Sequence, residues 1–302
     1  MIRVLVIGGS GMLGHKLCQL LPQHGFAVAA TIRRPADFAA RYPGVFRHVQ
    51  ILADVDALDD RQLQRAIDSA SPHVVVNCAG IVKQLPAARD PLASVGVNAY
   101  LPHKLARLCG RQDRRLIHVS TDCVFAGTRG MYRECDPSDA HDLYGMTKYL
   151  GETVAEETAA VTLRTSIVGR ELEVPGHGLL EWFLAQNGTP VRGFARATFS
   201  GLTTHELARV VAKIVIDHPR LQGLYQVASQ PITKFDLLQL VRRAYGLPTE
   251  ITRDEEVTCD RSLNMARLHD ATGYVPPAWR EMIAETAQDS TPYVDFHHNQ
   301  RN

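Results

Sequence analysis

The feature that most constrains this chain is the segment Gly8-Gly9-Ser10-Gly11-Met12-Leu13-Gly14, which follows an apolar run and precedes a helical pattern. A strand, a glycine turn and a helix in this order form a cradle for phosphate groups. Gly8 permits the tight turn, Gly11 lets the backbone approach a pyrophosphate, and Gly14 lets the helix pack against the strand. The start of the helix offers N–H groups and a partial positive charge to the anion. We therefore expect a bound dinucleotide to contact Gly8, Ser10, Gly11, Met12, Leu13 and Gly14.

Short apolar runs alternate with helical patterns through the first half of the chain. This alternation predicts an α/β fold, a doubly wound parallel (Rossmann) sheet with ligands at the carboxyl ends of its strands. Continuous apolar residues around Val75 indicate a strand that is buried on both faces. The expected strands are residues 3–7, 27–32, 46–51, 73–77, 116–120 and 160–164. The expected helices are residues 11–24, 59–70, 91–110 and 143–157.

After about Thr165 the pattern changes to loops rich in Gly, Pro and Arg, mixed with further helices. These helices are expected at residues 178–186, 204–217, 234–245 and 279–287. We predict a dinucleotide-binding domain over residues 1–165, which also takes back about 200–218. An interleaved, smaller mixed α/β portion over residues 166–302 would bind the substrate. The polar tail from Asp289, with His297 and His298, is expected to be loose.

The composition excludes several classes of function. A net charge of +1 over 302 residues gives no global field to attract nucleic acid or an anionic membrane. No apolar run approaches the roughly 20 residues of a membrane span, and the first strand begins too early for a signal peptide. The six cysteines are scattered without a C-x-x-C pair. We therefore expect no metal site, no disulfide framework and a cytoplasmic location.

A second group of residues indicates acid–base chemistry. Tyr144 and Lys148 are four residues apart and would share one helix face, and Thr121 ends an apolar strand at the ligand-binding edge of the sheet. A free phenol has a pKa of about 10, which a neighbouring ammonium lowers. In a ketone reduction, a nicotinamide would deliver hydride while Tyr144 protonates the forming alkoxide. Thr121 would hydrogen-bond the same oxygen, and Lys148 would also anchor the nicotinamide ribose.

These motifs, in this order, resemble the extended short-chain dehydrogenases/reductases, and within them the dTDP-4-dehydrorhamnose reductase family. Residues 120–127, 132–134, 144–152 and 163–166 follow that family's pattern S-T-D-x-V-F-x-G, Y-x-E, Y-G-x-[ST]-K-x-x-G-E and R-T. The resemblance implies a catalytic triad of Thr121, Tyr144 and Lys148. It also implies cofactor contacts at Tyr144, Lys148, Asp54, Val55, Cys78, Ala79, Gly80 and Asn98.

The implied activity is reduction of the 4-keto group of a nucleotide-activated 4-keto-6-deoxyhexose for polysaccharide or glycoconjugate synthesis. Cys123 stands where these reductases usually have an aromatic residue, and residues 78–84 also diverge. The substrate is therefore either dTDP-4-dehydrorhamnose or a UDP-linked analogue, for example an N-acetylated one. Related dehydratases have Asp-Glu after the threonine, whereas Asp122 here precedes Cys123, so dehydration is not expected. By analogy, the helices at 91–110 and 143–157 would pair in a homodimer.

The choice of cofactor depends on Arg33 and Arg34, which follow the second strand. Arginines attract the 2′-phosphate that an acidic residue would repel, so NADPH is expected, with NADH as the alternative. A nucleotide diphosphate needs cationic partners, and Arg192, Arg196 and Arg261 are expected in loops of the second half. Trp182 and Phe183 are expected in the core. The predicted substrate contacts are Lys83, Asp122, Cys123, Arg192 and Arg261.

Two other functions remain open. An epimerase-reductase resembling the GDP-fucose synthases would use Cys123, two residues after Thr121, with His177 as its partner, because thiol and imidazole suit proton transfer beside a ketone. A non-catalytic, NADP-binding regulatory subunit would resemble that of a methionine adenosyltransferase. The intact Thr121, Tyr144 and Lys148 argue against a purely regulatory role.

Overall fold

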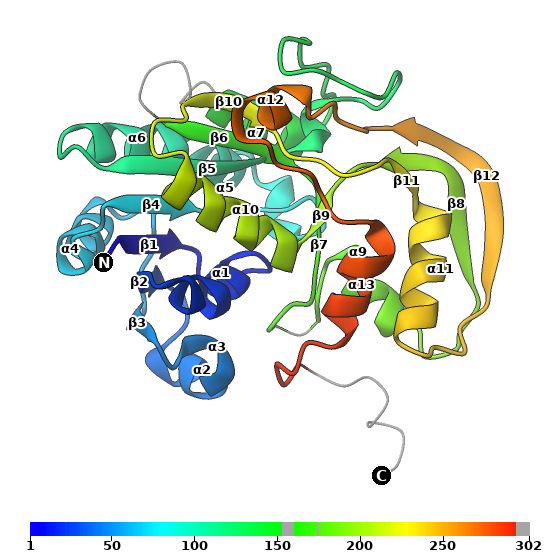
Figure 1. Ribbon diagram of the computed structural model, residues 1–302, viewed down its shortest axis with the longest axis horizontal. Coiled ribbons are helices and arrows are strands. Elements are labelled where there is room, and N and C mark those ends of the chain that lie inside the picture. The colour runs from blue at the N-terminus through cyan, green and yellow to red at the C-terminus, as the bar shows by residue number, and fades with distance from the viewer. Residues whose placement is uncertain (153–159, 174, 294–302) are drawn as a thin grey trace.

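The computed structural model describes residues 1–152, 160–173 and 175–293. Its centre is a seven-stranded parallel sheet in the order β10-β6-β5-β4-β1-β2-β3 (Figure 1). The expected doubly wound α/β fold is thereby confirmed. The strands of this sheet are β1 (Arg3–Ile7), β2 (Ala27–Thr31), β3 (Val49–Leu52), β4 (Val74–Asn77), β5 (Arg115–Thr121), β6 (Val161–Thr165) and β10 (Gly223–Gln226).

Helices follow most of these strands. In the first half they are α1 (Gly14–Leu20), η1 (Leu21–His24), α2 (Ala36–Ala40), α3 (Pro43–Phe46), α4 (Asp60–Ala70), η2 (Pro86–Arg89), α5 (Pro91–Ser94), the π-helical η3 (Val95–Tyr100), α6 (Leu101–Gly110), η4 (Asp122–Val124) and α7 (Leu143–Glu152). In the second half they are α9 (Leu179–Leu184), α10 (Thr204–Asp217), α11 (Lys234–Ala244), α12 (Ala266–Thr272) and α13 (Trp279–Ala287).

Several boundaries differ from the prediction. Residues 11–13 form the turn before α1, and the helix expected at 91–110 is divided into α5, η3 and α6. Phe46 was expected in a strand but ends α3, because Pro43 starts a short helix there before β3 begins at Val49. The expected end of the helix at Glu157 lies outside the described residues, as do His297 and His298.

The two faces of the main sheet carry separate hydrophobic clusters. Val4 and Val6 of β1 belong to the cluster that contains Leu17 of α1, whereas Leu5 and Ile7 belong to the cluster with residues of α4 and α6. Successive side chains of a strand point to opposite faces of the sheet, so helices cover both faces of β1. This arrangement explains why the strand is apolar at four successive positions, from Val4 to Ile7, rather than at alternate ones.

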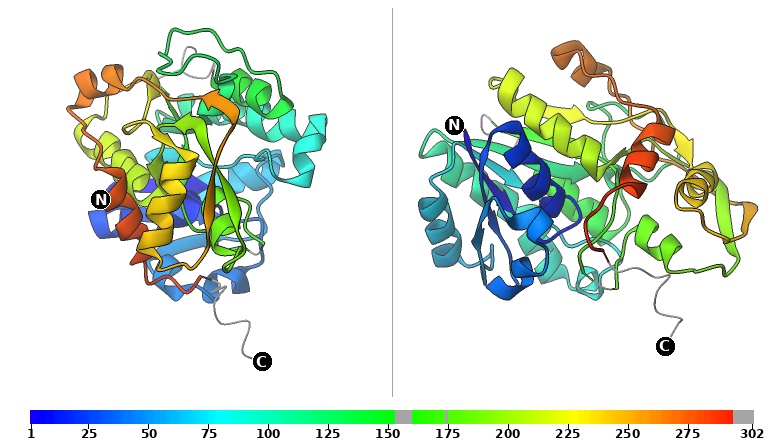
Figure 2. Two further views of the ribbon diagram at one scale, coloured as in Figure 1. Left: turned by 90° about the vertical axis from the view of Figure 1, so that its right-hand side faces the viewer. Right: turned by 60° about the horizontal axis from the view of Figure 1, so that its bottom comes forward.

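The second half of the chain builds a smaller sheet beside the main one. It has the order β11-β8-β12, formed by β8 (Val191–Phe199), β11 (Ile232–Thr233) and β12 (Ile251–Asp260), and β7 (Ile167–Val168) pairs separately with β9 (Leu202–Thr203). Figure 2 shows β8, β12 and α11 together on one side of the molecule, away from β1, β2 and β3. Helix α10 packs against α1, and β10 joins the main sheet, so the second half contributes to both portions.

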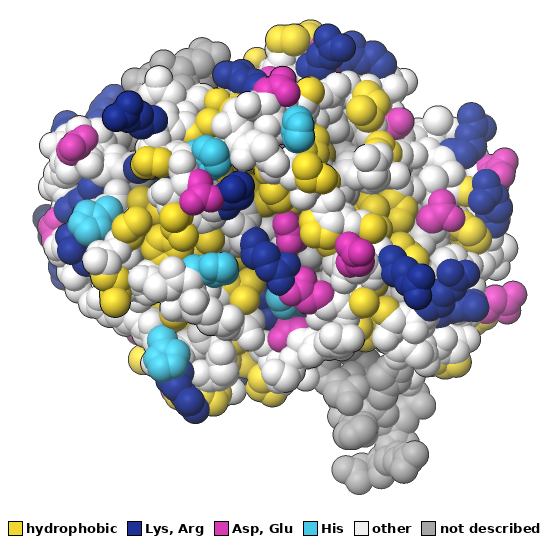
Figure 3. All heavy atoms as spheres, in the orientation of Figure 1, with side chains coloured by type: hydrophobic (Ala, Val, Ile, Leu, Met, Phe, Trp, Pro, Cys, Tyr) yellow, Lys and Arg dark blue, Asp and Glu magenta, His cyan; other side chains and the backbone are white. Residues whose placement is uncertain are grey.

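One face of the molecule carries charges of both signs. On the side drawn in Figure 3, basic and acidic side chains are interspersed, as a net charge of +1 allows. Within the described ranges, no helix combines the length and apolar character that crossing a membrane requires. The six cysteines are free thiols.

We predict that Gly14→Ala destabilises the fold, because a Cβ at Gly14 would lie 2.0 Å from the Gly8 carbonyl oxygen. Neither backbone can move away without displacing β1 or α1. Overpacking of this kind lowers the free energy of unfolding by about 1–3 kcal/mol, which urea denaturation would measure.

The matched control is Gly110→Ala at the end of α6, where a Cβ would meet nothing within 4 Å among the described residues. We expect this control to keep or slightly raise the stability. Equal stabilities of the two variants would contradict the prediction.

Candidate active site

The glycine turn joins β1 to α1 at the carboxyl edge of the sheet. Gly8 has a φ of +87°, and a Cβ there would lie 3.1 Å from the Ala79 backbone nitrogen, so the turn lies against the segment after β4. Among the described residues, a Cβ at Gly11 would meet only the Gly8 carbonyl oxygen, at 3.4 Å. The N–H groups of Met12 and Leu13 have no acceptor in the described part of the chain. An open backbone face with free donors fits a pyrophosphate.

The predicted adenosine contacts come together beside this turn. The Val55 N–H donates to the Ile32 carbonyl at 3.0 Å, and the Asp54 N–H donates to the Arg34 carbonyl at 3.2 Å. Arg33 and Arg34 are both exposed. The Arg34 guanidinium is held by Glu173, whose Oε1 lies 3.1 Å from its Nε. A 2′-phosphate at Arg34 would therefore compete with Glu173, a residue that the sequence analysis did not identify.

Asn98 was predicted to contact the cofactor, and in the structure its side chain forms hydrogen bonds with the backbone of Ile81. Its Oδ1 accepts from the Ile81 N–H at 2.9 Å, and its Nδ2 donates to the Ile81 carbonyl at 3.1 Å. Only 1% of Asn98 is exposed. The amide therefore braces the loop of Cys78, Ala79 and Gly80 and would act on a cofactor through that loop.

The three predicted catalytic residues lie on β5 and α7, which pack together. Thr121 ends β5, and its hydroxyl accepts from the Cys123 N–H at 3.1 Å. Tyr144 lies in the first turn of α7, where Asp142 accepts from the Gly145 N–H at 2.8 Å. Lys148 follows one turn later, so phenol, ammonium and hydroxyl meet at the carboxyl end of β5.

Burial controls the charge states of these groups. It raises the pKa of Tyr144 above its usual value, and Cys123 acts in the same direction while a hydrogen bond with Thr121 opposes it. Burial lowers the pKa of Lys148 to about 8, against the opposing charge of Glu152. The Lys148 ammonium donates to the Val119 carbonyl at 2.7 Å. Burial therefore outweighs the lowering of the Tyr144 pKa that the sequence analysis expected from Lys148, and the phenol keeps its proton at neutral pH.

Several predicted substrate contacts border the same site. The Arg261 Nε donates to the Phe125 carbonyl at 2.7 Å, and its charge acts on Asp122 and Cys123. Burial raises the pKa of Asp122 and raises the pKa of Cys123 to about 12. The Lys83 ammonium lies 2.7 Å from an Asp142 carboxylate oxygen, just before α7.

Lys234 also lies near Asp122 and was missed by the sequence analysis. It is the first residue of α11, more than 110 positions later in the chain. No local pattern signals this proximity, because it depends on where the folded chain places the start of α11.

Arg192 is the one predicted substrate contact that the structure keeps away from the site. Both Arg192 and Arg196 lie on β8 rather than in loops. Arg192 pairs with Asp254 and Glu256 near the start of β8, whereas Thr198, opposite Asp260, marks the end next to Arg261. Six strand residues span about 20 Å. The prediction failed because the parallel pairing of β8 with β12 could not be read from the sequence.

The residues after β7 lie over the glycine turn. The Glu171 carboxylate accepts from the N–H groups of His177 and Gly178, at 2.9 and 2.6 Å, and a Cβ at Gly178 would lie 2.4 Å from the Met12 methyl carbon. The described residues show no contact between His177 and Cys123. On α9, Phe183 is buried as expected, but 42% of Trp182 is exposed.

Comparisons with known proteins agree with these features. Residues 2–291 match the family described as the RmlD substrate binding domain. The spore coat polysaccharide biosynthesis protein SpsK of Bacillus subtilis is 28% identical, over 98% of this chain and 100% of its own. Methionine adenosyltransferase 2 subunit beta of Pongo abelii is 32% identical, over 83% of this chain and 74% of its own. The crystal structure of dTDP-4-dehydrorhamnose reductase from Bacillus anthracis in complex with NADP has the same fold, with a TM-score of 0.76 at 19% identity over 95% of this chain and 98% of that one.

We predict that the stability difference between the wild type and Lys148→Met depends on pH. The folded protein has a Lys148 pKa of about 8, against an ordinary value of 10.5 in the unfolded chain. Between these values the unfolded chain binds more protons, so the wild type gains stability relative to the variant as pH rises. The gain approaches about 3 kcal/mol between pH 7 and 10.5.

Urea denaturation of both proteins at several pH values would measure this gain. Comparing the two proteins cancels the titration of the groups that do not interact with Lys148. A difference that does not change with pH would refute the lowered pKa of Lys148.

Proposed function

Because this chain belongs to the family of the RmlD substrate binding domain, we propose that it is a nicotinamide-dependent reductase of a nucleotide-activated 4-keto-6-deoxyhexose. The observation that carries the proposal is the convergence of Thr121, Tyr144 and Lys148 at the sheet edge that also holds the glycine turn. The Bacillus anthracis protein of the same fold is a dTDP-4-dehydrorhamnose reductase crystallised with NADP, which supports the same reaction class.

The proposed cofactor is NADPH, held by the open N–H groups of Met12 and Leu13 and by Arg33 and Arg34. When bound, it supplies hydride to the carbonyl carbon. NADH is the alternative, because the bond between Glu173 and Arg34 must yield to a 2′-phosphate. This exposed ion pair is weak enough to be displaced, since such pairs contribute about 0.2–1 kcal/mol.

The chain's own residues handle the proton. Tyr144 is a neutral phenol at pH 7 and donates its proton to the carbonyl oxygen as that oxygen gains negative charge. The Thr121 hydroxyl donates a hydrogen bond to the same oxygen, which holds the carbonyl in place. Lys148, with a pKa of about 8, is still mostly protonated at pH 7 and stabilises the phenolate that remains.

The proposed substrate carries a diphosphate near Arg261 and Lys83 and a sugar near Asp122 and Cys123. Arg261 is anchored at Phe125, so its guanidinium is presented in a fixed direction. A buried thiol at Cys123 leaves more room than an aromatic residue would. This extra room favours a bulkier sugar, such as an N-acetylated one linked to UDP, over dTDP-4-dehydrorhamnose.

We also propose a cytoplasmic homodimer. The free thiols fit a reducing compartment. Large apolar side chains are exposed on the helices α5, η3 and α7, namely Leu92, Val95, Tyr100, Met146 and Leu150. These helices are the ones for which the sequence predicts pairing, and an exposed apolar surface of this kind marks an interface.

Two other functions compete with reduction. The 32% identity to a methionine adenosyltransferase subunit favours a regulatory role in which NADP binds without turnover. Epimerization by Cys123 is less favoured, because a thiol with a pKa of about 12 is a poor proton acceptor at neutral pH. His177, its proposed partner, lies beside the glycine turn instead.

We predict that Tyr144→Phe lowers the turnover of a dTDP- or UDP-linked 4-keto-6-deoxyhexose by about 10²–10⁴-fold, because the proton donor is lost. Its Kd for NADPH should stay within about twofold of the wild type, since a phenyl ring fills the same space. NADPH oxidation and fluorescence titration measure the two quantities, and titration with NADH tests the cofactor choice.

The control is Tyr149→Phe on the same helix, whose side chain is 41% exposed. It should leave both quantities unchanged. If the wild type binds NADPH but reduces neither dTDP-linked nor UDP-linked 4-keto-6-deoxyhexoses, the regulatory function replaces reduction as the proposed function.

We further predict that the reduced sugar formed in D₂O carries no deuterium at C3 or C5. Epimerization must remove a proton beside the ketone and return one from solvent, whereas reduction exchanges neither position. Mass spectrometry of the product separates the two reactions. Deuterium at either carbon in the wild type, and its loss in Cys123→Ser, would establish the epimerase.

A further inference from the structure

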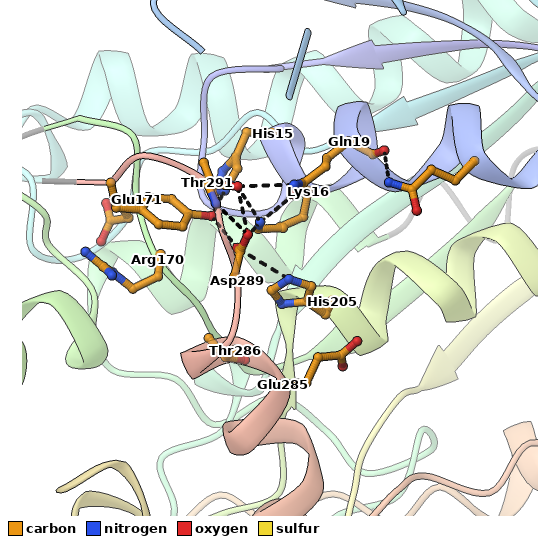
Figure 4. Close-up of polar contacts among 12 residues, drawn as sticks. His15, Lys16, Gln19, Arg170, Glu171, His205, Glu285, Thr286, Asp289 and Thr291 are labelled. Atoms are coloured by element: carbon orange, nitrogen blue, oxygen red, sulfur yellow. Dashed lines mark hydrogen bonds and ion pairs between the residues drawn. The ribbon is translucent and has the colours of Figure 1, made fainter. Parts of the chain in front are cut away.

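Helix α1 carries two polar side chains, His15 and Lys16, that are completely buried directly after the glycine turn. A buried ammonium is costly unless it is paired. Lys16 donates to Gln19 of the same helix at 2.5 Å, and its other partners come from the opposite end of the chain, from residues 288–293, which we name the C-terminal strap. The Lys16 ammonium forms an ion pair with Asp289 and donates to the Thr291 hydroxyl at 3.5 Å (Figure 4). The Asp289 carboxylate also lies 3.4 Å from the His205 Nε2.

His15 connects the strap to the glycine turn. Its Nδ1 lies 2.9 Å from the Gly11 carbonyl oxygen, and its Nε2 lies 2.8 Å from the Tyr293 hydroxyl. A carbonyl oxygen only accepts, so Nδ1 carries the proton, and the buried, neutral ring uses Nε2 as an acceptor. The Tyr293 hydroxyl also lies 3.0 Å from the Asp289 carboxylate, so its single proton is donated either to this carboxylate or to the His15 Nε2 at any one time. Tyr293 therefore joins the ion pair of Lys16 to the imidazole of His15.

The Gly11 carbonyl is the atom through which the strap reaches the cofactor site. It accepts from the backbone N–H of His15 at 3.0 Å as well as from the imidazole. This carbonyl and the N–H of Met12 belong to one planar peptide unit, in which they point in opposite directions. Holding the carbonyl toward His15 therefore aims the Met12 N–H at the open face of the turn. Gly11 itself resists rotation poorly, because glycine is conformationally permissive.

The strap has a second anchor in the substrate-binding portion. The Arg170 guanidinium lies over the Tyr293 ring, 4.6 Å from its centroid, and its Nε donates to Glu181 of α9 at 2.6 Å. The adjacent Glu171 holds the loop that lies against Met12. The strap thus lies between the glycine turn and the elements that cover it.

We propose that the C-terminal strap positions the glycine turn for the cofactor's pyrophosphate, with Tyr293 and His15 as positioning residues. Without them, the Gly11 carbonyl keeps only the bond from the His15 backbone N–H, and the peptide between Gly11 and Met12 is held less firmly against rotation. This inference rests on the proposed binding of NADPH at the turn. The affinity of the glycine turn for the pyrophosphate then depends partly on Tyr293, which lies 278 positions after His15 in the sequence.

The test uses the full-length protein and the variant Tyr293→Phe, which keeps the ring over Arg170 and removes the hydroxyl. The probes are NADPH, ADP-ribose, which contains the pyrophosphate, and adenosine 2′-monophosphate, which lacks it. We expect the Kd for NADPH and ADP-ribose to rise about 3- to 10-fold, the range of one lost hydrogen bond. The Kd for adenosine 2′-monophosphate should not change.

Tyr274→Phe is the matched control, because it removes another buried hydroxyl, one that donates to Glu206 at 2.9 Å and has no contact with His15. It should lower the melting temperature as much as Tyr293→Phe does but leave all three Kd values unchanged. A second pair of variants tests the imidazole. His15→Asn keeps a donor for the Gly11 carbonyl and should bind ADP-ribose within about twofold of the wild type, whereas His15→Leu loses about 10-fold.

Two results would overturn the proposal. One is an unchanged Kd for ADP-ribose in both Tyr293→Phe and His15→Leu. The other is an equal weakening of all three probes, which indicates a general loss of structure. A wild type that binds neither NADPH nor ADP-ribose would instead reject the proposed cofactor itself.

Discussion

The close contact between Gly8 and Gly14 is the constraint on which the rest of the site depends. With 2.0 Å between the Gly8 carbonyl oxygen and a Cβ at Gly14, α1 starts as near to β1 as two backbones can approach. This approach makes the turn compact enough for Ala79 to lie beside it. The ends of β1 and β4, and of β5 next to them, therefore border one site. Thr121 lies at the same edge of the sheet as the turn because β4 pairs with both β1 and β5.

Burial determines the charge of the reactive groups more than their neighbours do. It shifts Asp122, Cys123, Tyr144 and Lys148 all toward their neutral forms. Arg261 cannot lose its proton, so it remains the persistent charge at this edge of the site. Its guanidinium attracts a negatively charged substrate, and the raised pKa of Asp122 reduces the opposing charge of that carboxyl.

Local signals explain what the sequence predicted well. The helices at 204–217 and 279–287 have the predicted bounds, and Thr203 caps the first of them through its side chain. Six strands of the main sheet, β1 to β6, also lie within about two residues of their predicted ends, apart from the start of β3, because apolar runs between turns are local features. The seventh strand, β10, was not predicted. The wrong start of β3 also has a local cause, since a short helix at Pro43 precedes it.

Long-range pairings explain what could not be predicted. The parallel pairing of β8 with β12 joins segments about 60 residues apart and decides that Arg261, not Arg192, reaches the site. The same holds for Glu173 on Arg34 and Lys234 near Asp122, whose roles exist only in the folded chain. The sequence predicts which types of residue form the site. It predicts which of these residues lie together only where they belong to one strand-turn-helix unit.

The ion pair between Lys16 and Asp289 has a consequence for the order of folding during synthesis. The two residues are 273 positions apart, and ribosomes add roughly 5–20 residues per second. For some tens of seconds the emerging first strands and α1 have no counter-charge for Lys16, and β10 is also missing from the edge of the main sheet. The dinucleotide-binding half is therefore synthesised first but completed last. In a nascent chain that stops before Asp289, the buried ammonium of Lys16 lacks its carboxylate partner.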